Sequence, residues 1–166
     1  DMKNVCQACH GKNFVENFYE QFDGLVHLYN DKFAIPGAKL MKVMKDEKLI
    51  TLAEFDDKIE WTWYFLWHHE GRRARHGASM QAPDYVQWHG MYEVAHRFYT
   101  EMVPEVREVI EKAEKAGKHA GAKKLKAALD EILNSSDHRW FIGKMPAEEE
   151  AKRKAQAEAF KKRYAQ

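Results

Sequence analysis

Apolar side chains recur at intervals of three and four positions along most of this chain. Between about Asn13 and Phe33 they form one helical face, made of Phe14, Phe18, Phe22, Leu25, Val26 and Tyr29. No stretch of useful length alternates with a period of two, and no Asn-Gly or Asp-Gly turn separates two such stretches. The pattern therefore predicts an all-α, multihelical domain with long antiparallel helices.

Proline, glycine and capping residues divide this pattern into separate predicted helices. Pro36-Gly37 should end the first helix, and the capping box Thr51-Leu52-Ala53-Glu54 should begin a long one. Gln81-Ala82-Pro83-Asp84 should end that helix and begin the next. We expect helices over residues 13–33, 38–48, 51–78, 83–102, 104–116, 122–133 and 146–164.

The uneven distribution of histidine and aromatic residues predicts that the functional residues lie in the first part of the chain. The 166 residues are 45% apolar and 32% charged, which suits one globular domain or a fragment of a larger protein. No apolar run approaches the ~18 residues of a membrane span, and a net charge of +1 argues against nucleic-acid binding. Most of the nine histidines and 21 aromatic residues fall in the first hundred positions. The segment 146–166 is predicted to be a charged, solvated C-terminal helix.

The only two cysteines lie in the motif Cys6-Gln7-Ala8-Cys9-His10. Two thiols at this spacing can add to the two vinyl groups of one haem, and His10 can then reach the iron as its proximal ligand. A redox CxxC would need a βαβ pattern around it, and a zinc site would need a second ligand pair. We therefore predict one covalent haem c, with residues 1–11 as its attachment segment and 12–145 as the main helical domain.

Covalent haem attachment of this kind takes place after export, so the motif predicts an extracytoplasmic location. Asp1 to Val5 is polar and contains no apolar signal-peptide core. We expect the chain to have been processed or, as the favoured alternative, cut from a longer polypeptide.

A second cluster of candidate functional residues, made of histidines and arginines, lies between Trp67 and His76. His69 and His76 are seven positions apart, so on a helix they share one face at a separation of about 10 Å. Such histidines could ligate haem iron, and Arg72, Arg73 and Arg75 could pair with haem propionates. The ordinary alternative is a set of core or surface histidines with an arginine–Glu70 ion pair.

Tyrosine and histidine alternate along the next predicted helix. Steps of four and three join Tyr85, His89, Tyr92, His96 and Tyr99, which predicts one continuous stripe. A hydrophobic core prefers Leu, Ile and Val, because buried hydroxyl and imidazole groups need hydrogen-bond partners. The stripe therefore indicates either the edge of a cofactor or a half-buried helix whose tyrosines reach water.

Two longer segments resemble the C-terminal part of the octahaem hydroxylamine oxidoreductase family. They are Trp67-His68-His69-Glu70-Gly71-Arg72-Arg73-Ala74-Arg75-His76-Gly77-Ala78 and Pro83-Asp84-Tyr85-Val86-Gln87-Trp88-His89-Gly90. The CxxCH motif and the segments Leu28-Tyr29-Asn30 and Lys32-Phe33-Ala34 add to the resemblance, which covers Cys6 to about Glu101.

This resemblance implies an extracytoplasmic homotrimer in which seven bis-His haems form an electron wire around one modified catalytic haem. Hydroxylamine or hydrazine binds to the open iron of that haem and is oxidised, and the electrons pass to an acceptor cytochrome. A tyrosine crosslinks to the catalytic haem of a neighbouring subunit. Tyr85 is the best match for it, and Tyr92 is the second choice.

The resemblance also implies roles for the other residues. The haem held by Cys6, Cys9 and His10 would relay electrons, and Arg72 and Arg73 would bind cofactor propionates. His69 and His89 are the best candidates for distal iron ligands, with His68, His76 and His27 as weaker ones.

Two departures limit what can be carried over. The family has eight haem motifs and this chain has one, and the catalytic Asp and His that the family has near the open iron are expected upstream of these residues. We therefore expect the C-terminal part of such an enzyme, with further haems held by the rest of the polypeptide. Hydrazine dehydrogenase or a nitrite-reducing relative is an alternative within the family. A stand-alone monohaem electron carrier, or a helical interaction subunit with an incidental CxxCH, is an alternative outside it.

Overall fold

The computed structural model describes residues 1–164, so the last two positions of the predicted segment 146–166 lie outside it. Every regular element among these residues is a helix, which confirms the all-α class. None of the described helices is long and apolar enough to cross a membrane. The chain forms two compact units, one from Asp1 to Leu129 and one from Asp130 to the end of the described residues.

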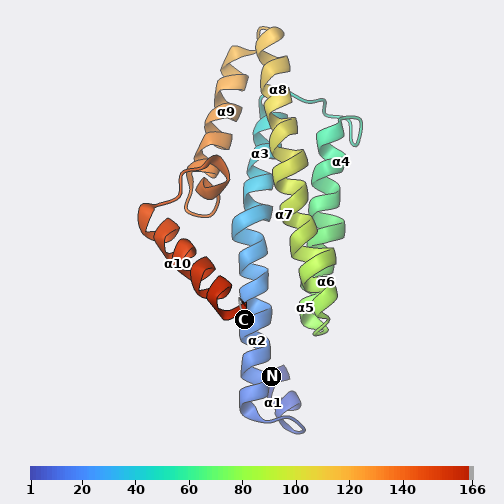
Figure 1. Cartoon of the computed structure of the whole chain (residues 1–166). Helices are drawn as coiled ribbons and strands as arrows, with labels where there is room; N and C mark the ends of the chain where they lie inside the picture. Colours follow the sequence, from blue (N-terminus) through green and yellow to red (C-terminus); the bar gives the residue numbers. More distant parts are fainter. Residues whose placement is uncertain (165–166) are drawn as a thin grey trace. The chain divides into compact units, whose positions relative to one another are not determined.

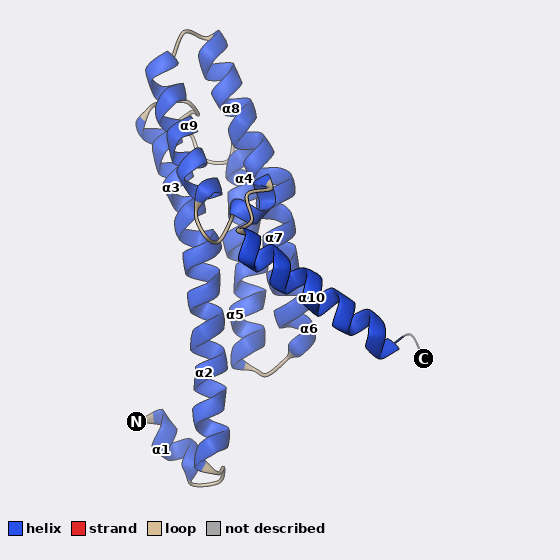
Figure 2. Cartoon of the chain, turned by 60° about the vertical axis from the view of Figure 1, so that its left-hand side comes forward, coloured by secondary structure: helices blue, strands red, loops and turns tan. Residues whose placement is uncertain are grey.

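The first unit contains three long helices, each built from α-helical pieces joined by π-helical turns (Figures 1 and 2). The first long helix follows the short α1 (Met2–Gln7) and consists of α2 (Lys12–Tyr29), a π turn (Asn30–Ala34) and α3 (Ile35–Asp46). The second consists of α4 (Lys58–Tyr64), a π turn (Phe65–Glu70) and α5 (Gly71–Ser79). The third consists of α6 (Pro83–Val86), a π turn (Gln87–Tyr92), α7 (Glu93–Arg97), a π turn (Phe98–Met102) and α8 (Val103–Lys115).

Two further α-helices follow. Helix α9 (His119–Asn134) begins in the first unit and ends in the second. The second unit then contains a short 3₁₀ helix (Arg139–Ile142) and α10 (Ala147–Tyr164). Helix α10 carries acidic residues in its first turn and basic residues in its last, which complements the helix dipole.

The predicted helix breaks at the two prolines are wrong, and both for the same reason. Pro36 and Pro104 each stand in the first turn of an α-helix that directly follows a π turn. The residue before each proline donates its N–H to the carbonyl five positions back. The backbone hydrogen-bond pattern has therefore already shifted by one residue at the position where proline lacks an N–H donor. Gly37 is also not a helix end: a Cβ there would collide with the Trp63 ring, so glycine lets α4 approach α3.

The capping box at Thr51 is also wrong as a helix start, because α4 begins only at Lys58. The Thr51 hydroxyl bonds to the Asp56 carboxylate at 2.7 Å, and the Thr51 N–H bonds to the Asp57 carboxylate at 2.9 Å. Phe55 adopts a left-handed backbone with φ of 62°, which a helix does not allow. The segment 51–57 is therefore a loop that is held by side-chain hydrogen bonds.

The core of the first unit lies between the three long helices, where α2 contacts α5, α3 contacts α4, and α5 contacts α6. Its fully buried side chains include Leu40, Met44, Leu66, Val94, Phe98, Met102, Val103 and Val106. Phe33 of the first long helix packs edge-on against Phe98 of the third, with ring centroids 5.4 Å apart.

Three buried carboxylates each pair with a cation from a neighbouring long helix. The pairs are Glu60 with Lys45 at 3.0 Å, Glu105 with Lys58 at 2.9 Å, and Glu70 with Arg97 at 2.9 Å. Each carboxylate side chain is at most 6% exposed. Because an unpaired buried charge is costly, these pairs favour one relative alignment of the helices.

Candidate functional site

A cavity of about 600 Å³ lies along the outer side of α5 and the turn that leads into α6. The residues that line it are His68, His69, Arg72, Arg73, His76, Gly77, Met80, Ala82 and Tyr85. Six of the site residues predicted from the sequence are in this set: three histidines, two arginines and Tyr85. They meet because five of them follow one another within little more than two helical turns and the sixth follows the next turn of the chain.

Two glycines hold the backbone of Tyr85 close to α5. A Cβ on Gly77 would lie 2.9 Å from the Tyr85 Cβ. A Cβ on Gly90 would collide with the Tyr85 carbonyl oxygen and lie 2.7 Å from the Ala74 Cα. The second and third long helices therefore approach closely at this point, and the Tyr85 side chain, 53% exposed, is held at the rim of the cavity.

His68 lies against the Arg72 guanidinium. Its Nε2 lies 3.1 Å from Arg72 Nη1, and since a guanidinium can only donate, Nε2 accepts and the ring proton is on Nδ1. Burial lowers the pKa of His68, and the charges of Arg72 and His69 lower it further. The ring stacks on Tyr64 with centroids 4.5 Å apart.

His69 has a nitrogen that no protein group binds. Its Nδ1 is buried and has no hydrogen-bond partner, while its ring lies 5.0 Å from Phe65 and 5.4 Å from Tyr64. A buried, unpartnered imidazole nitrogen calls for an explanation such as a bound ligand. His76, one heptad later, is exposed at the same cavity.

The arginines of this segment have separate partners. Arg72 contacts His68, and Arg73 pairs with Glu93 at 2.7 Å. Arg75 donates to the Gly71 carbonyl and lies over the Tyr29 ring at 4.9 Å, so it faces the first long helix and not the cavity. The arginine–Glu70 pair that the sequence left open is absent for all three, because Glu70 binds Arg97.

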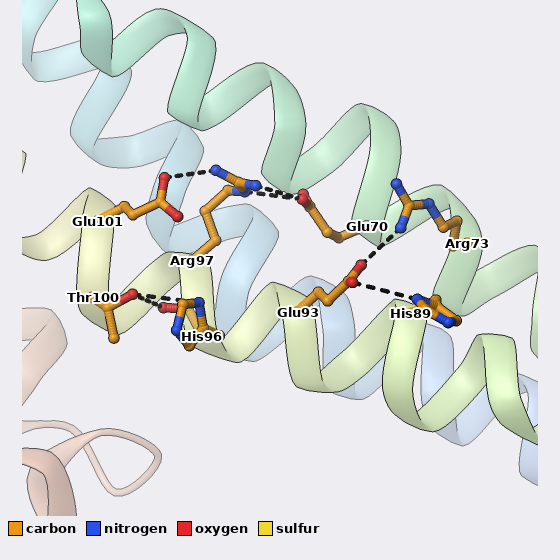
Figure 3. A network of polar contacts seen from close by, with 8 residues as sticks. All are labelled: Glu70, Arg73, His89, Glu93, His96, Arg97, Thr100 and Glu101. Atoms are coloured by element: carbon orange, nitrogen blue, oxygen red, sulfur yellow. Dashed lines mark hydrogen bonds and ion pairs between the residues drawn. The ribbon is translucent and has the colours of Figure 1, made fainter.

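Figure 3 shows the polar network beside the cavity, between the second and third long helices. Glu93 joins Arg73 to His89, whose Nδ1 lies 3.4 Å from the carboxylate. Arg97 bridges the buried Glu70, at 2.9 Å, and Glu101, at 2.6 Å. The sequence analysis missed Glu93 and Arg97. Their spacing of four from His89 and Glu101 was the available signal.

Besides the three CxxCH residues, three of the predicted site residues lie outside the cavity. His89 is half-exposed, with its ring 5.9 Å from that of Tyr85 and its Nε2 3.8 Å from Asp84. His27 is exposed on α2. Tyr92 is 56% exposed and lines a second cavity, of about 420 Å³, with Glu93, His96 and Arg97.

The predicted single stripe from Tyr85 to Tyr99 is wrong at its last member. Tyr85, His89, Tyr92 and His96 are exposed, whereas Tyr99 is 7% exposed and packs on Phe33. Each π turn carries one extra residue, so counting by three and four moves to another face after it. The turn at Phe98–Met102 begins between His96 and Tyr99, so the count fails at Tyr99.

The CxxCH motif occupies α1 and the turn after it. Cys6 is half-buried, Cys9 is exposed, and neither is in a disulfide. The His10 N–H donates to the Cys6 carbonyl at 3.0 Å, which closes the turn, and the His10 ring stacks on Phe14 with centroids 4.9 Å apart. Both thiols and the imidazole are therefore held within one short segment.

Comparison of the chain with protein-family models, with curated proteins and with solved structures finds no match.

The residues around the main cavity fit the edge of a haem. Imidazole is a common ligand of iron, and a guanidinium binds a propionate carboxylate in a bidentate way. The volume of about 600 Å³ falls in the range of roughly 300–1,000 Å³ that cofactor sites occupy. His68 and His69 each have a buried Nδ1 without a hydrogen-bond partner, Arg72 offers the exposed cation, and Tyr85 stands at the rim.

Proposed function

We propose that this chain is the C-terminal helical part of an extracytoplasmic multihaem c-type oxidoreductase that oxidises hydroxylamine to nitric oxide or nitrite. The observation that carries the proposal is the gathering of His68, His69, Arg72, Arg73 and Tyr85 around one cavity. These residues come from the two segments that resemble the octahaem hydroxylamine oxidoreductase family. The pairing of α2 with α5 and of α3 with α4 supports the long antiparallel arrangement expected of such a domain.

The haem attached at Cys6 and Cys9 is proposed to relay electrons, with His10 as the proximal ligand. Each thiol adds across one vinyl group: a carbon–sulfur bond forms, the thiol hydrogen moves to the adjacent carbon, and no oxidant is consumed. When bound, the haem supplies an iron that takes up and passes on single electrons. The chain holds Cys6, Cys9 and His10 together in one turn, and no disulfide competes for the thiols.

The cavity residues are proposed to serve a second haem, held by the rest of the polypeptide. His68 and His69 line the cavity, each with a buried Nδ1 that has no protein partner, and Arg72 presents an exposed guanidinium for a propionate. Arg73 already forms an ion pair with Glu93. We propose that it holds the third long helix beside the cavity and also contributes positive charge to the cavity. His89, with Nδ1 on Glu93, can offer Nε2 to an iron from outside the cavity.

Tyr85 is proposed to crosslink to the catalytic haem of a neighbouring subunit in a homotrimer. Its phenol is 53% exposed at the rim, while Gly77 and Gly90 fix its backbone. Such a crosslink distorts the macrocycle and favours oxidation over reduction. Hydrazine dehydrogenation or nitrite reduction by a relative is the alternative within the family, and a small acceptor cytochrome is the proposed electron partner.

The test compares Tyr85→Phe with Tyr92→Phe in the full-length natural enzyme. Tyr85→Phe should abolish the crosslink and the hydroxylamine oxidation and leave the low-spin haem absorbance unchanged, whereas Tyr92→Phe should retain all three. Mass measurement of the peptide from Asp84 to Gly90 should find an added haem peptide in the wild type and in Tyr92→Phe, but not in Tyr85→Phe. Unchanged turnover in Tyr85→Phe would contradict the assignment of this tyrosine.

The single CxxCH favours a stand-alone monohaem electron carrier as the second candidate function. Pyridine haemochrome quantification on the natural protein separates the two functions. One haem per intact polypeptide, with no long-wavelength absorbance from a crosslinked haem, supports the carrier. Free thiols at Cys6 and Cys9 after maturation would exclude both and leave a helical interaction subunit.

A further inference from the structure

Another groove, also about 600 Å³, runs along α2 from Phe14 to Leu25, opposite the turn between α5 and α6. Its apolar wall on α2 consists of Phe14, Phe18, Phe22 and Leu25, and Pro83 and Val86 of α6 face it. The rings of Phe18 and Phe22 are parallel within 4°, with centroids 6.2 Å apart. Phe14 is 51% exposed. A continuous aromatic wall of this kind is a surface that a ligand or partner covers.

The groove begins at the haem attachment motif. His10 stacks on Phe14 at a centroid distance of 4.9 Å and an angle of 23°, and Phe14 is the first residue of the groove along the chain. Helix α1, which carries Cys6, joins α2 at this same end (Figures 1 and 2). A group bound to Cys6, Cys9 and His10 is therefore placed next to the wall.

The polar part of the lining consists of side-chain amides: Asn17, Gln21, Gln81 and Gln87. They can donate and accept hydrogen bonds but are neutral. No histidine, methionine or cysteine is among the residues that line the groove. The groove thus offers an apolar wall and neutral hydrogen bonds, and it does not offer a second strong iron ligand.

We propose that this groove holds the porphyrin of the haem that is attached at Cys6 and Cys9. The inference rests on the haem attachment in the proposed function and adds the place of that haem. The α2 phenyl rings exclude water from it, and the amides bind at its polar edge. The main cavity beside His69 remains for a different haem.

The test uses the full chain matured with haem, with ¹³C-labelled Leu and Val methyl groups. Leu25 and Val86 line the groove, and Val106, fully buried in α8, is the control within the same unit. If the haem lies in the groove, oxidation of the ferrous to the ferric protein should shift the Leu25 and Val86 methyl signals or broaden them beyond detection. The Val106 signal should not change.

A second measurement uses matched serine variants. Phe22→Ser should lower the haem midpoint potential, because added water stabilises the more positive ferric state. Phe160→Ser, at a 64% exposed position on α10, should leave the potential unchanged.

Three results would overturn the inference. If the protein carries one haem per chain and the Leu25 and Val86 signals do not change with its redox state, the haem does not lie in the groove. The proposed function would not be affected by that result. Signals that respond to dilution instead would assign the groove to contact between copies of the chain. Absence of attached haem would refute the proposed function together with the inference.

Discussion

Replacement of Gly90 by alanine tests the close approach of the helices that positions Tyr85. The added Cβ would collide with the Tyr85 carbonyl oxygen and lie 2.7 Å from the Ala74 Cα and 2.8 Å from its Cβ. Two of these contacts are with backbone, which cannot rotate away as a side chain can. The helices must separate, or the turn between α5 and α6 must move.

Gly24 supplies the matched control. It lies within α2, and a Cβ there would meet nothing within 4 Å. Alanine at a helical position gains about 0.5–1 kcal/mol over glycine, because glycine loses more backbone entropy on folding. Overpacking in a filled site costs typically about 1–3 kcal/mol. We therefore expect Gly24→Ala to stabilise the chain, and Gly90→Ala to have a free energy of unfolding about 1–3 kcal/mol lower than that of Gly24→Ala.

The measurement is urea-induced unfolding followed by circular dichroism at 222 nm, the helical signal. Both variants should keep the denaturant slope of the wild type, so that midpoints can be compared directly. Equal stabilisation by both substitutions would show that the second and third long helices do not approach at Gly90. The account of Tyr85 as a rigidly held rim residue would then be wrong.

The remaining predictions concern the charges between the helices. Lys58→Met should destabilise the chain by leaving the buried Glu105 carboxylate without its cation, and Glu105→Gln in the same chain should restore much of the loss, as urea titration would show. The hydrogen bond and charge of Glu105 raise the pKa of Lys58 above its ordinary 10.5. The pair therefore stabilises the fold below that ordinary value and loses its effect as the pH rises through the raised one. As the pH is raised above 10.5, the wild type should lose more stability than Lys58→Met, and an equal loss would contradict the coupling. Glu70→Gln should cost about 1–3 kcal/mol because the carboxylate is buried on Arg97, whereas Glu93→Gln should cost at most about 1 kcal/mol because its pair is part-exposed; a reversed order in thermal unfolding would refute this ranking.

Helical periodicity was sufficient to predict the fold class, because it depends only on which faces are apolar. The helix ends at Pro36, Thr51 and Pro104 could not be predicted from the same signals. A proline or a capping residue indicates only a local preference for a helix end. In this chain, a π turn or a loop of side-chain hydrogen bonds determines where the helix begins or ends. Those arrangements depend on neighbouring helices and on the ladder before the residue.

Six of the predicted site residues line one cavity in large part because they are close together in the sequence. His68, His69, Arg72 and His76 follow one another along one helix, so their proximity needs no tertiary information. The pairs between the long helices do need it: Arg73 meets Glu93 twenty residues later, and Arg97 meets Glu70. Which carboxylate each arginine binds is fixed only when the helices have aligned.

The π turns also determine how the sequence tolerates changes in length. A π turn accommodates one residue more than an α turn, so the helix on its far side keeps the orientation that it would have without the extra residue. Loss of a single residue within Asn30–Ala34 or Gln87–Tyr92 would convert the turn to regular α-helix and leave the following side chains on their faces. The same loss within α8 would rotate every later residue of that helix by about 100° and turn Val106 and Ile110 away from the core. Single-residue gaps among related chains should therefore concentrate at these turns.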